Sequence, residues 1–221
     1  MCTVTWAHSA NGYELFCNRD EKRSRRTALL PRVHLQNGVN YAAPVDPEFG
    51  GTWIGVNQYG VAMTLLNRYP TGSGLMSRGL LLNDLLDSES LEEAAQRLWA
   101  RDLSCFGSFT TAIFEKRKSA FVLTWDGSTK RSIEAANLLT SSSFDQEGAE
   151  RARLAALGRT RRMEAFHTSH ANGPSAYSPC MHRPDAETVS FTRIAVKHNS
   201  IEMFYSPDAP CRQKPGVLIR L

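Results

Sequence analysis

The sequence predicts an α+β fold in which antiparallel sheets are layered with helices. Two observations carry this prediction: strand-like segments arrive mostly as hairpins, and helix-like segments are grouped between them. A doubly wound parallel sheet would instead alternate single strands with crossover helices. The chain has 221 residues. This length fits two small domains at most, and we expect a single domain over residues 1–221.

The first predicted element is a β-hairpin over residues 2–20. An apolar-rich stretch at 3–7 is followed by Asn11-Gly12 and then by a second β-prone stretch at 13–18. Asn-Gly between two such runs is a strong hairpin signal, because both residues tolerate positive φ. Residues 21–50 are rich in arginine and are predicted to form a long loop.

Two further hairpins and two helices are predicted in the middle of the chain. The hairpins join residues 52–57 to 61–67 and residues 109–114 to 120–125. Leucines at mostly helical spacings predict one helix over 77–87. Ser90 followed by Glu92-Glu93 resembles a capped helix start, and an apolar stripe continues beyond it.

The last third is predicted to contain strands on both sides of a basic helix. Residues 136–143 are predicted as a strand, 147–166 as a partly amphipathic helix and 171–188 as a loop containing Gly173 and several prolines. Strands are expected again at 188–196, 201–205 and 217–221.

The composition favours an ordinary globular protein. Hydrophobic residues make up 42% and charged residues 22%, and the net charge of +4 is too small to indicate a nucleic-acid partner. No apolar run approaches the roughly 20 residues of a membrane span, and the N-terminus lacks the basic start and apolar run of a secretory signal. We therefore expect a cytoplasmic protein whose five widely spaced cysteines are free thiols.

Cys2 is the first candidate for chemistry, because it directly follows Met1. Removal of Met1 would leave one residue with a thiol and a free α-amine, which titrate near ~8.5 and ~7.7–8.0 respectively. A nucleophile beside a base suits attack on an amide or a related acyl carbon. The alternative is that Cys2 is a small hydrophobic residue of a strand.

Charged residues follow the second strand of the first hairpin. An antiparallel hairpin brings Arg19 and Asp20 back beside Cys2. A guanidinium within about 4 Å of a thiolate is worth ~4 kcal/mol at an effective dielectric constant of about 20, although desolvation opposes part of that. Arg19 would favour the thiolate, and Asp20 would hold the amine. Successive strand residues point to opposite faces, so both reach Cys2 only if the strand ends or bulges there. The alternative is a solvated charged turn.

The string Asn18-Arg19-Asp20-Glu21 resembles the signature of the NRDE-motif family, which includes transport and Golgi organisation protein 2. Met1-Cys2, the run Gly-Gly-Thr-Trp-Ile-Gly at 50–55, residues 60–67 and Ser-Arg-Gly at 77–79 match in the same order. The resemblance covers roughly the first ninety residues well. Residues 188–205 resemble the closing strands of the family less specifically.

This family in turn resembles the N-terminal-nucleophile (Ntn) hydrolases, particularly the cysteine branch with penicillin V acylase and bile salt hydrolase. The resemblance implies a four-layer αββα sandwich and a cysteine amidohydrolase that cleaves a non-peptide amide bond of a small acyl compound. It implies Cys2 as the nucleophile, Arg19 and Asp20 as the charged pair beside it, and Asn67 as an oxyanion contributor.

The resemblance also implies substrate contacts from Asn18, Ser143 and Arg193. Residues 140–143 read Thr-Ser-Ser-Ser where the branch would place an asparagine. A serine hydroxyl can donate a hydrogen bond but has a shorter reach, and losing one good oxyanion donor costs roughly 3–4 kcal/mol in the transition state. For Arg193, the alternative is a plain surface residue of a strand.

Two alternatives stay open. The same fold could serve a binding or trafficking factor that holds a lipid-like or haem-like ligand. His167, His170, Cys180 and His182 could bind zinc, but their spacing matches no zinc finger well, so we expect neither a metal nor a cofactor. The expected partner is a small-molecule substrate or ligand, and the sequence does not indicate an oligomeric state.

Overall fold

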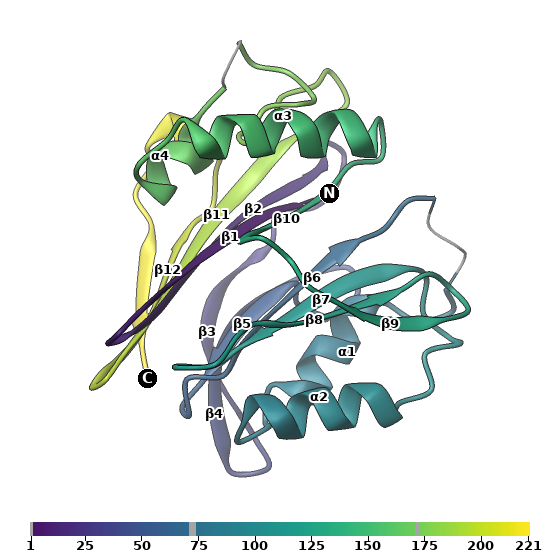
Figure 1. The fold of residues 1–221 in the computed structure, drawn as a ribbon, viewed down its shortest axis with the longest axis vertical. Coiled ribbons are helices and arrows are strands. Elements are labelled where there is room, and N and C mark those ends of the chain that lie inside the picture. Colours follow the sequence, from purple (N-terminus) through teal and green to yellow (C-terminus); the bar gives the residue numbers. More distant parts are fainter. Residues whose placement is uncertain (1, 71–73, 171–172) are drawn as a thin grey trace.

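A computed structural model describes residues 2–70, 74–170 and 173–221, and its elements form four layers (Figure 1). Two antiparallel sheets face each other in the middle. Helices α3 (Gln146–Gly158) and α4 (Met163–Thr168) cover one sheet, and helices α1 (Arg78–Leu85) and α2 (Leu91–Ala100) cover the other. The predicted αββα sandwich is confirmed.

The first sheet has six strands in the order β10-β1-β2-β11-β12-β13, with antiparallel pairing throughout. In that order the strands are Leu138–Ser141, Cys2–Ser9, Gly12–Lys22, Ala186–Lys197, Ser200–Ser206 and Val217–Arg220. The predicted N-terminal hairpin is confirmed, with Cys2 opposite Arg19. Cys2 therefore lies inside a sheet, with a neighbouring strand on each side.

The second sheet has seven strands in sequence order, β3 to β9. They are Leu29–Gln36, Val39–Val45, Ile54–Asn57, Ala62–Asn67, Phe109–Phe114, Phe121–Trp125 and Lys130–Ile133. The two hairpins predicted at 52–67 and 109–125 form its centre. The helix predicted after Ser90 is α2, whose start is capped by a hydrogen bond from the Glu93 amide to the Ser90 hydroxyl.

Two predictions were wrong in detail. Residues 21–50 are not a long loop, because β3 and β4 form a hairpin there. The single helix predicted over 147–166 is two helices, since the chain turns after Gly158 and is extended at Arg162 before α4 begins. Strand β9 was not predicted at all; it is short and mostly exposed at the edge of its sheet.

The two faces of β1 meet different layers. Val4 and Trp6 point between the two sheets, where they pack with Ile54 and Phe114 from the opposite sheet. Cys2 shares this face by the strand alternation. Thr5 points the other way, and its hydroxyl lies 2.9 Å from Nε2 of His167 on α4. The side chain of Cys2 thus points toward the space between the sheets.

None of the helices in the described part of the chain is long and apolar enough to cross a membrane.

Candidate active site around Cys2

Cys2 lies between two neighbouring strands and close to a pocket. It pairs with Arg19 of β2 on one side and with Ser141 of β10 on the other. Its backbone N–H donates a hydrogen bond to the Ser141 hydroxyl over 3.0 Å, and the residue is only 6% exposed. This pairing fixes the position of both the backbone nitrogen and the side chain of Cys2.

A second cysteine lies beside Cys2 on the same face of the hairpin. Cys17 pairs with Val4, so it is diagonal to Cys2 across the two strands. A hydrogen bond from the Cys17 thiol lowers the pKa of Cys2, and burial opposes this. The charge of Asp20 also raises that pKa, and the charge of Arg19 lowers it to a smaller extent. The same hydrogen bond raises the pKa of Cys17 well above its usual value. Of the two sulfurs, Cys2 therefore ionises first.

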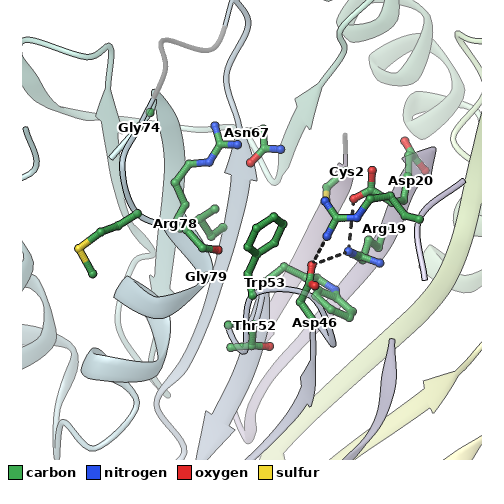
Figure 2. Close-up of a pocket in the computed structure, with 18 of the residues that line it drawn as sticks. Cys2, Arg19, Asp20, Asp46, Thr52, Trp53, Asn67, Gly74, Arg78 and Gly79 are labelled. Carbon is green, nitrogen blue, oxygen red and sulfur yellow. Dashed lines mark hydrogen bonds and ion pairs between the residues drawn. The ribbon is translucent and has the colours of Figure 1, made fainter. Parts of the chain in front are cut away.

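Arg19 is held rigidly on the pocket side of β2. Its guanidinium carbon lies 4.2 Å from the centre of the Trp53 ring, which is a cation–π contact. Its Nη2 atom lies 3.3 Å from carboxylate oxygens of both Glu21 and Asp46. Figure 2 shows Arg19 and Asp46 joined beside Cys2. The positive charge near the thiol is thus balanced locally by two carboxylates.

Asp20 points to the opposite face of β2, toward the helical layer. Its Oδ1 accepts a 2.6 Å hydrogen bond from the Thr188 hydroxyl, and its Oδ2 lies 3.5 Å from Nη2 of Arg153. Burial raises the pKa of Asp20, and Arg153 works against that rise. Asp20 follows Arg19, the residue that pairs with Cys2. Although its side chain points to the other face, Asp20 is close enough to Cys2 to line the same pocket. The strand alternation is kept, and both charged residues still border the site.

Arg153 is a site residue that sequence reasoning missed. It lies on α3 and is fully buried, with Nε donating to the Ser178 carbonyl over 3.3 Å and Nη1 donating to the Thr140 hydroxyl. The available signal was its place on the helix: Ala149, Arg153 and Ala156 are spaced four and three residues apart and form the buried stripe. An arginine on that stripe requires a buried partner, which here is Asp20.

Asn18 is buried behind the pocket. Its side-chain amide donates to the carbonyl oxygens of His167 and Pro179, over 2.9 Å and 2.8 Å. It is not among the residues that line the pocket. Asn18 therefore joins the sheet to α4 and to the following loop.

The other predicted site residues are divided between the pocket and the surface. Asn67, at the end of β6, lines the pocket (Figure 2). Ser143 is exposed and does not line it, whereas Ser141 of the same run contacts Cys2. Arg193 pairs with Glu14 and with Glu164, the latter at 3.8 Å, and the structure does not bring it to Cys2.

The pocket is about 320 Å³ in volume and combines charged and apolar walls. Phe49, Leu75 and Met76 are exposed apolar side chains along it. Arg78, at the start of α1, donates to the Ser108 carbonyl over 3.0 Å, and none of the described carboxylates forms an ion pair with it. The apolar side chains of this pocket could contact an acyl chain, and its charged side chains could contact a polar or anionic group.

Comparison with known proteins gives one family and several structures. The profile of the Transport and Golgi organisation 2 family matches residues 1–172. No curated protein sequence matches the chain significantly. Among solved structures, an N-acylethanolamine-hydrolyzing acid amidase orthologue from Caenorhabditis elegans is 14% identical with a TM-score of 0.60. The match covers 88% of this chain and 92% of that one.

Conjugated bile acid hydrolase from Clostridium perfringens is similar in two variant forms. An arginine-to-leucine variant is 10% identical with a TM-score of 0.62, covering 99% of this chain and 92% of the other. A cysteine-to-alanine variant is 11% identical with a TM-score of 0.60, covering 100% and 92%. These structures have the Ntn-hydrolase fold, and the likeness establishes that this chain has the same fold. Because the sequence identity is so low, the likeness establishes the fold alone.

Proposed function

Because the chain belongs to the Transport and Golgi organisation 2 family and has the Ntn-hydrolase fold, we propose that it is an N-terminal cysteine amidohydrolase. It would cleave a non-peptide amide bond of a small acyl compound. The observation that carries the proposal is the position of Cys2, which borders the pocket and lies between Arg19 of β2 and Ser141 of β10. The neighbouring Cys17 thiol lowers the pKa of its sulfur. The likeness to an N-acylethanolamine-hydrolyzing acid amidase orthologue and to a conjugated bile acid hydrolase is in keeping with this reaction class.

The reaction begins with removal of Met1, which lies outside the described residues. The backbone nitrogen of Cys2 then becomes a primary amine next to the Ser141 hydroxyl, 3.0 Å away. The amine takes the thiol proton, and the thiolate attacks the carbonyl carbon of the substrate, forming a C–S bond. The ammonium returns the proton to the leaving nitrogen as the C–N bond breaks. Water then hydrolyses the thioester, which releases the carboxylic acid and regenerates the thiol.

Three neighbours support these steps. Arg19 adds a positive potential that favours the thiolate. Asp20 contributes a carboxylate near the terminal amine, held in place by Thr188 and Arg153. The side-chain amide of Asn67 would donate to the developing oxyanion, a type of contact that is worth roughly 3–4 kcal/mol in the transition state.

The test is turnover of a panel of N-acyl amines and N-acyl amino acids of increasing acyl length, followed by release of the free amine. We expect one acyl class to be cleaved, Cys2→Ala to abolish cleavage, and Cys105→Ala to leave it unchanged. Cys105 is a suitable control because it is a free cysteine that does not line the pocket. Equal turnover by the Cys2→Ala variant would rule out the mechanism.

A second candidate function is binding without catalysis, with a lipid-like or haem-like ligand in the same pocket. Two observations favour it: Arg19 is paired with Glu21 and Asp46, which reduces its effect on the thiol, and Leu75 is 94% exposed at the pocket. The rate of Cys2 alkylation by iodoacetamide at neutral pH separates the two functions. A fast rate supports the hydrolase, because the thiolate is the reactive form, and an inert Cys2 supports the binding protein.

A further inference from the structure

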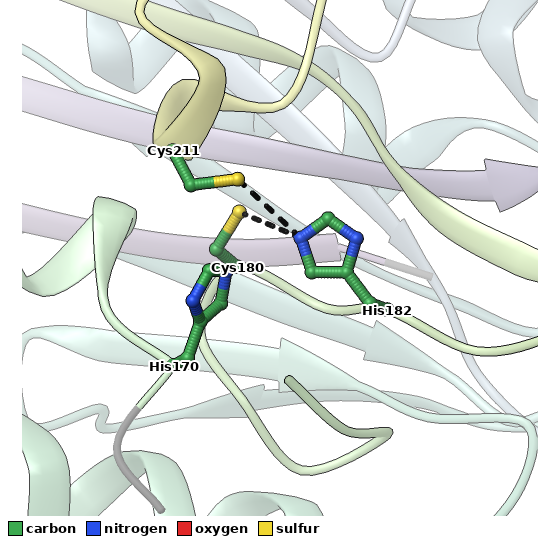
Figure 3. A group of neighbouring side chains, drawn as sticks. All are labelled: His170, Cys180, His182 and Cys211. Carbon is green, nitrogen blue, oxygen red and sulfur yellow. Dashed lines mark hydrogen bonds between the residues drawn. The ribbon is translucent and has the colours of Figure 1, made fainter. Parts of the chain in front are cut away.

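A cluster of two cysteines and two histidines lies on the outer side of the Cys2 sheet, where the loop that follows α4 meets a short helix near the end of the chain. It consists of His170, Cys180, His182 and Cys211 (Figure 3), and we call it the Cys-His cluster. One potential ligand atom from each residue lies within 4.8 Å of every other. Three of the residues come from the loop that follows α4, and Cys211 comes from the short 3₁₀ helix Pro210–Arg212. None of them lines the pocket at Cys2.

The distances from His182 to the two sulfurs are those of a tetrahedral site. Zinc–sulfur bonds of about 2.3 Å and zinc–nitrogen bonds of about 2.0–2.1 Å place a sulfur and a nitrogen ligand about 3.6 Å apart. Nε2 of His182 lies 3.6 Å from Sγ of Cys180 and 3.4 Å from Sγ of Cys211. Both distances agree with that tetrahedral edge to within about 0.2 Å. Small side-chain movements would bring all four donors onto one ion.

The surroundings of the two histidines fit ligation. Nδ1 of His182 lies 3.5 Å from a carboxylate oxygen of Glu187, so Nε2 is directed at the sulfurs. A carboxylate on the far nitrogen of a histidine ligand is the usual arrangement, because it fixes the tautomer and the ring orientation. Arg23 and Arg212 in turn bind Glu187. Nε2 of His170 is buried, and the described part of the chain offers it no hydrogen-bond partner.

We propose that the Cys-His cluster binds one zinc ion through two thiolates and two imidazoles. Each thiol loses its proton to solvent as its sulfur–zinc bond forms, and no electron is transferred. Two sulfur and two nitrogen donors select a tetrahedral, thiophilic ion, and four protein ligands leave no position for substrate. The ion is structural: it joins the loop after α4 to the 3₁₀ helix near the end of the chain.

This zinc site would also stabilise the residues behind Cys2. Pro179, directly before Cys180, accepts a hydrogen bond from Asn18. Met181, directly after it, donates its N–H to the Thr188 hydroxyl over 2.8 Å, and that hydroxyl donates to Asp20. The metal would thus fix the loop whose backbone holds Asn18 and, through Thr188, Asp20. The metal site itself does not depend on the proposed hydrolase activity.

The direct test is the metal content of the purified full-length protein after passage over a chelating resin. We expect close to one zinc per chain, at least tenfold less in Cys211→Ser, and an unchanged content in Cys105→Ser. Cys211 is the better ligand to replace because it is half-buried, whereas Cys180 is fully buried. Cys105 is also half-buried and lies outside the cluster, so it is the matched control.

Cobalt supplies a second readout that needs no enzyme activity. Demetallated protein titrated with Co²⁺ should give intense visible bands of tetrahedral cobalt and a thiolate charge-transfer band in the near ultraviolet. The charge-transfer band should fall by about half in Cys211→Ser, because one of two sulfur ligands is lost. Weak octahedral bands in the wild type, or a Cys180–Cys211 disulfide in protein purified under reducing conditions, would overturn the proposal. Both measurements remain informative if the chain cleaves no substrate.

Discussion

Asp20 and Arg153 form an ion pair inside the protein, with Oδ2 and Nη2 3.5 Å apart and neither side chain exposed to solvent. The two residues are 133 positions apart and belong to different layers, β2 and α3. The pair connects the helical layer to the strand that carries Arg19, one residue from the Cys2 pairing. It therefore links the packing of α3 to the geometry of the candidate active site.

Replacement of one partner of this ion pair should destabilise the folded protein. Arg153→Met leaves Asp20 buried opposite an apolar group, and we expect the free energy of unfolding to fall by about 3–5 kcal/mol. The double variant Asp20→Asn with Arg153→Met should recover part of that loss, since neither charge is then left unpaired. Urea unfolding of the four proteins in this double-mutant cycle measures the coupling. Additive effects of the two substitutions would show that the pair is not coupled.

Removal of the Cys17 thiol should make Cys2 less reactive. The hydrogen bond from Cys17 is the largest cause that lowers the pKa of Cys2. In Cys17→Ala that pKa should rise, and the rate of Cys2 alkylation by iodoacetamide at pH 7 should fall by about threefold to tenfold. The measurement is the pH profile of modification at the Cys2 peptide, with Cys105→Ala as control. A profile that stays in place would mean that Cys17 does not control the thiolate.

His167 should make the protein sensitive to acid. Burial, with a contribution from Arg153, lowers the pKa of His167 from 6.5 to about 3. Because the folded pKa is below the unfolded one, the neutral ring stabilises the fold above pH 6.5, and this contribution is lost as the pH falls toward about 3. At pH 5 the loss is about 2 kcal/mol.

The variant His167→Gln isolates this effect, because an amide can still reach the Thr5 hydroxyl, which lies 2.9 Å from Nε2 of the native ring. We expect the drop in unfolding free energy between pH 7 and pH 5 to be smaller in the variant by about 2 kcal/mol. Chemical denaturation at the two pH values gives the comparison. The other histidines are common to both proteins and cancel in the difference. Parallel pH dependence in the two proteins would be evidence against a buried neutral imidazole.

The backbones of Gly51 and Gly79 lie so close together that neither position should tolerate a side chain. A β carbon on Gly51 would lie 2.4 Å from the carbonyl carbon of Gly79, at the point where the Thr52 N–H donates to the Gly79 carbonyl. We expect Gly51→Ala to lower the unfolding free energy by about 1–3 kcal/mol. Gly158→Ala is the control, since its β carbon would meet nothing within 4 Å. Equal stability of the two variants would contradict the structure of this pocket wall.

Local patterns predicted most of the fold. The Asn11-Gly12 turn and the β-prone stretches on either side of it located the hairpin that contains Cys2 and Arg19. The hairpin β3–β4 was missed because the arginines of this segment, together with Pro44 and Pro47, indicated a loop; the segment also contains Pro31, which lies in β3. Proline is tolerated there since β3 is an edge strand, and Pro44 lies beyond the short pairing of β4 with β5. Whether a strand can contain a proline at a given position can be judged only when the order of the strands is known.

The predicted site was incomplete where it depended on distant parts of the chain. Strand alternation predicted that Arg19 and Asp20 diverge, but nothing near Asp20 indicated that Arg153 would be its partner. For the metal ligands, the sequence suggested His167, whereas the structure places His167 against Thr5 and brings Cys211 to the cluster instead. Cys211 follows His182 by 29 residues, and only the tertiary fold of the C-terminal strands brings them together.

If Cys2 is an N-terminal nucleophile, it becomes acylated during turnover, and the mass of the N-terminal peptide after brief incubation with a cleaved N-acyl amine reports this. We expect a peptide that begins at Cys2 and, in samples quenched with acid, carries the acyl group of the substrate. A peptide that still begins at Met1, or one that stays unacylated while the substrate is being cleaved, would show that Cys2 is not the nucleophile.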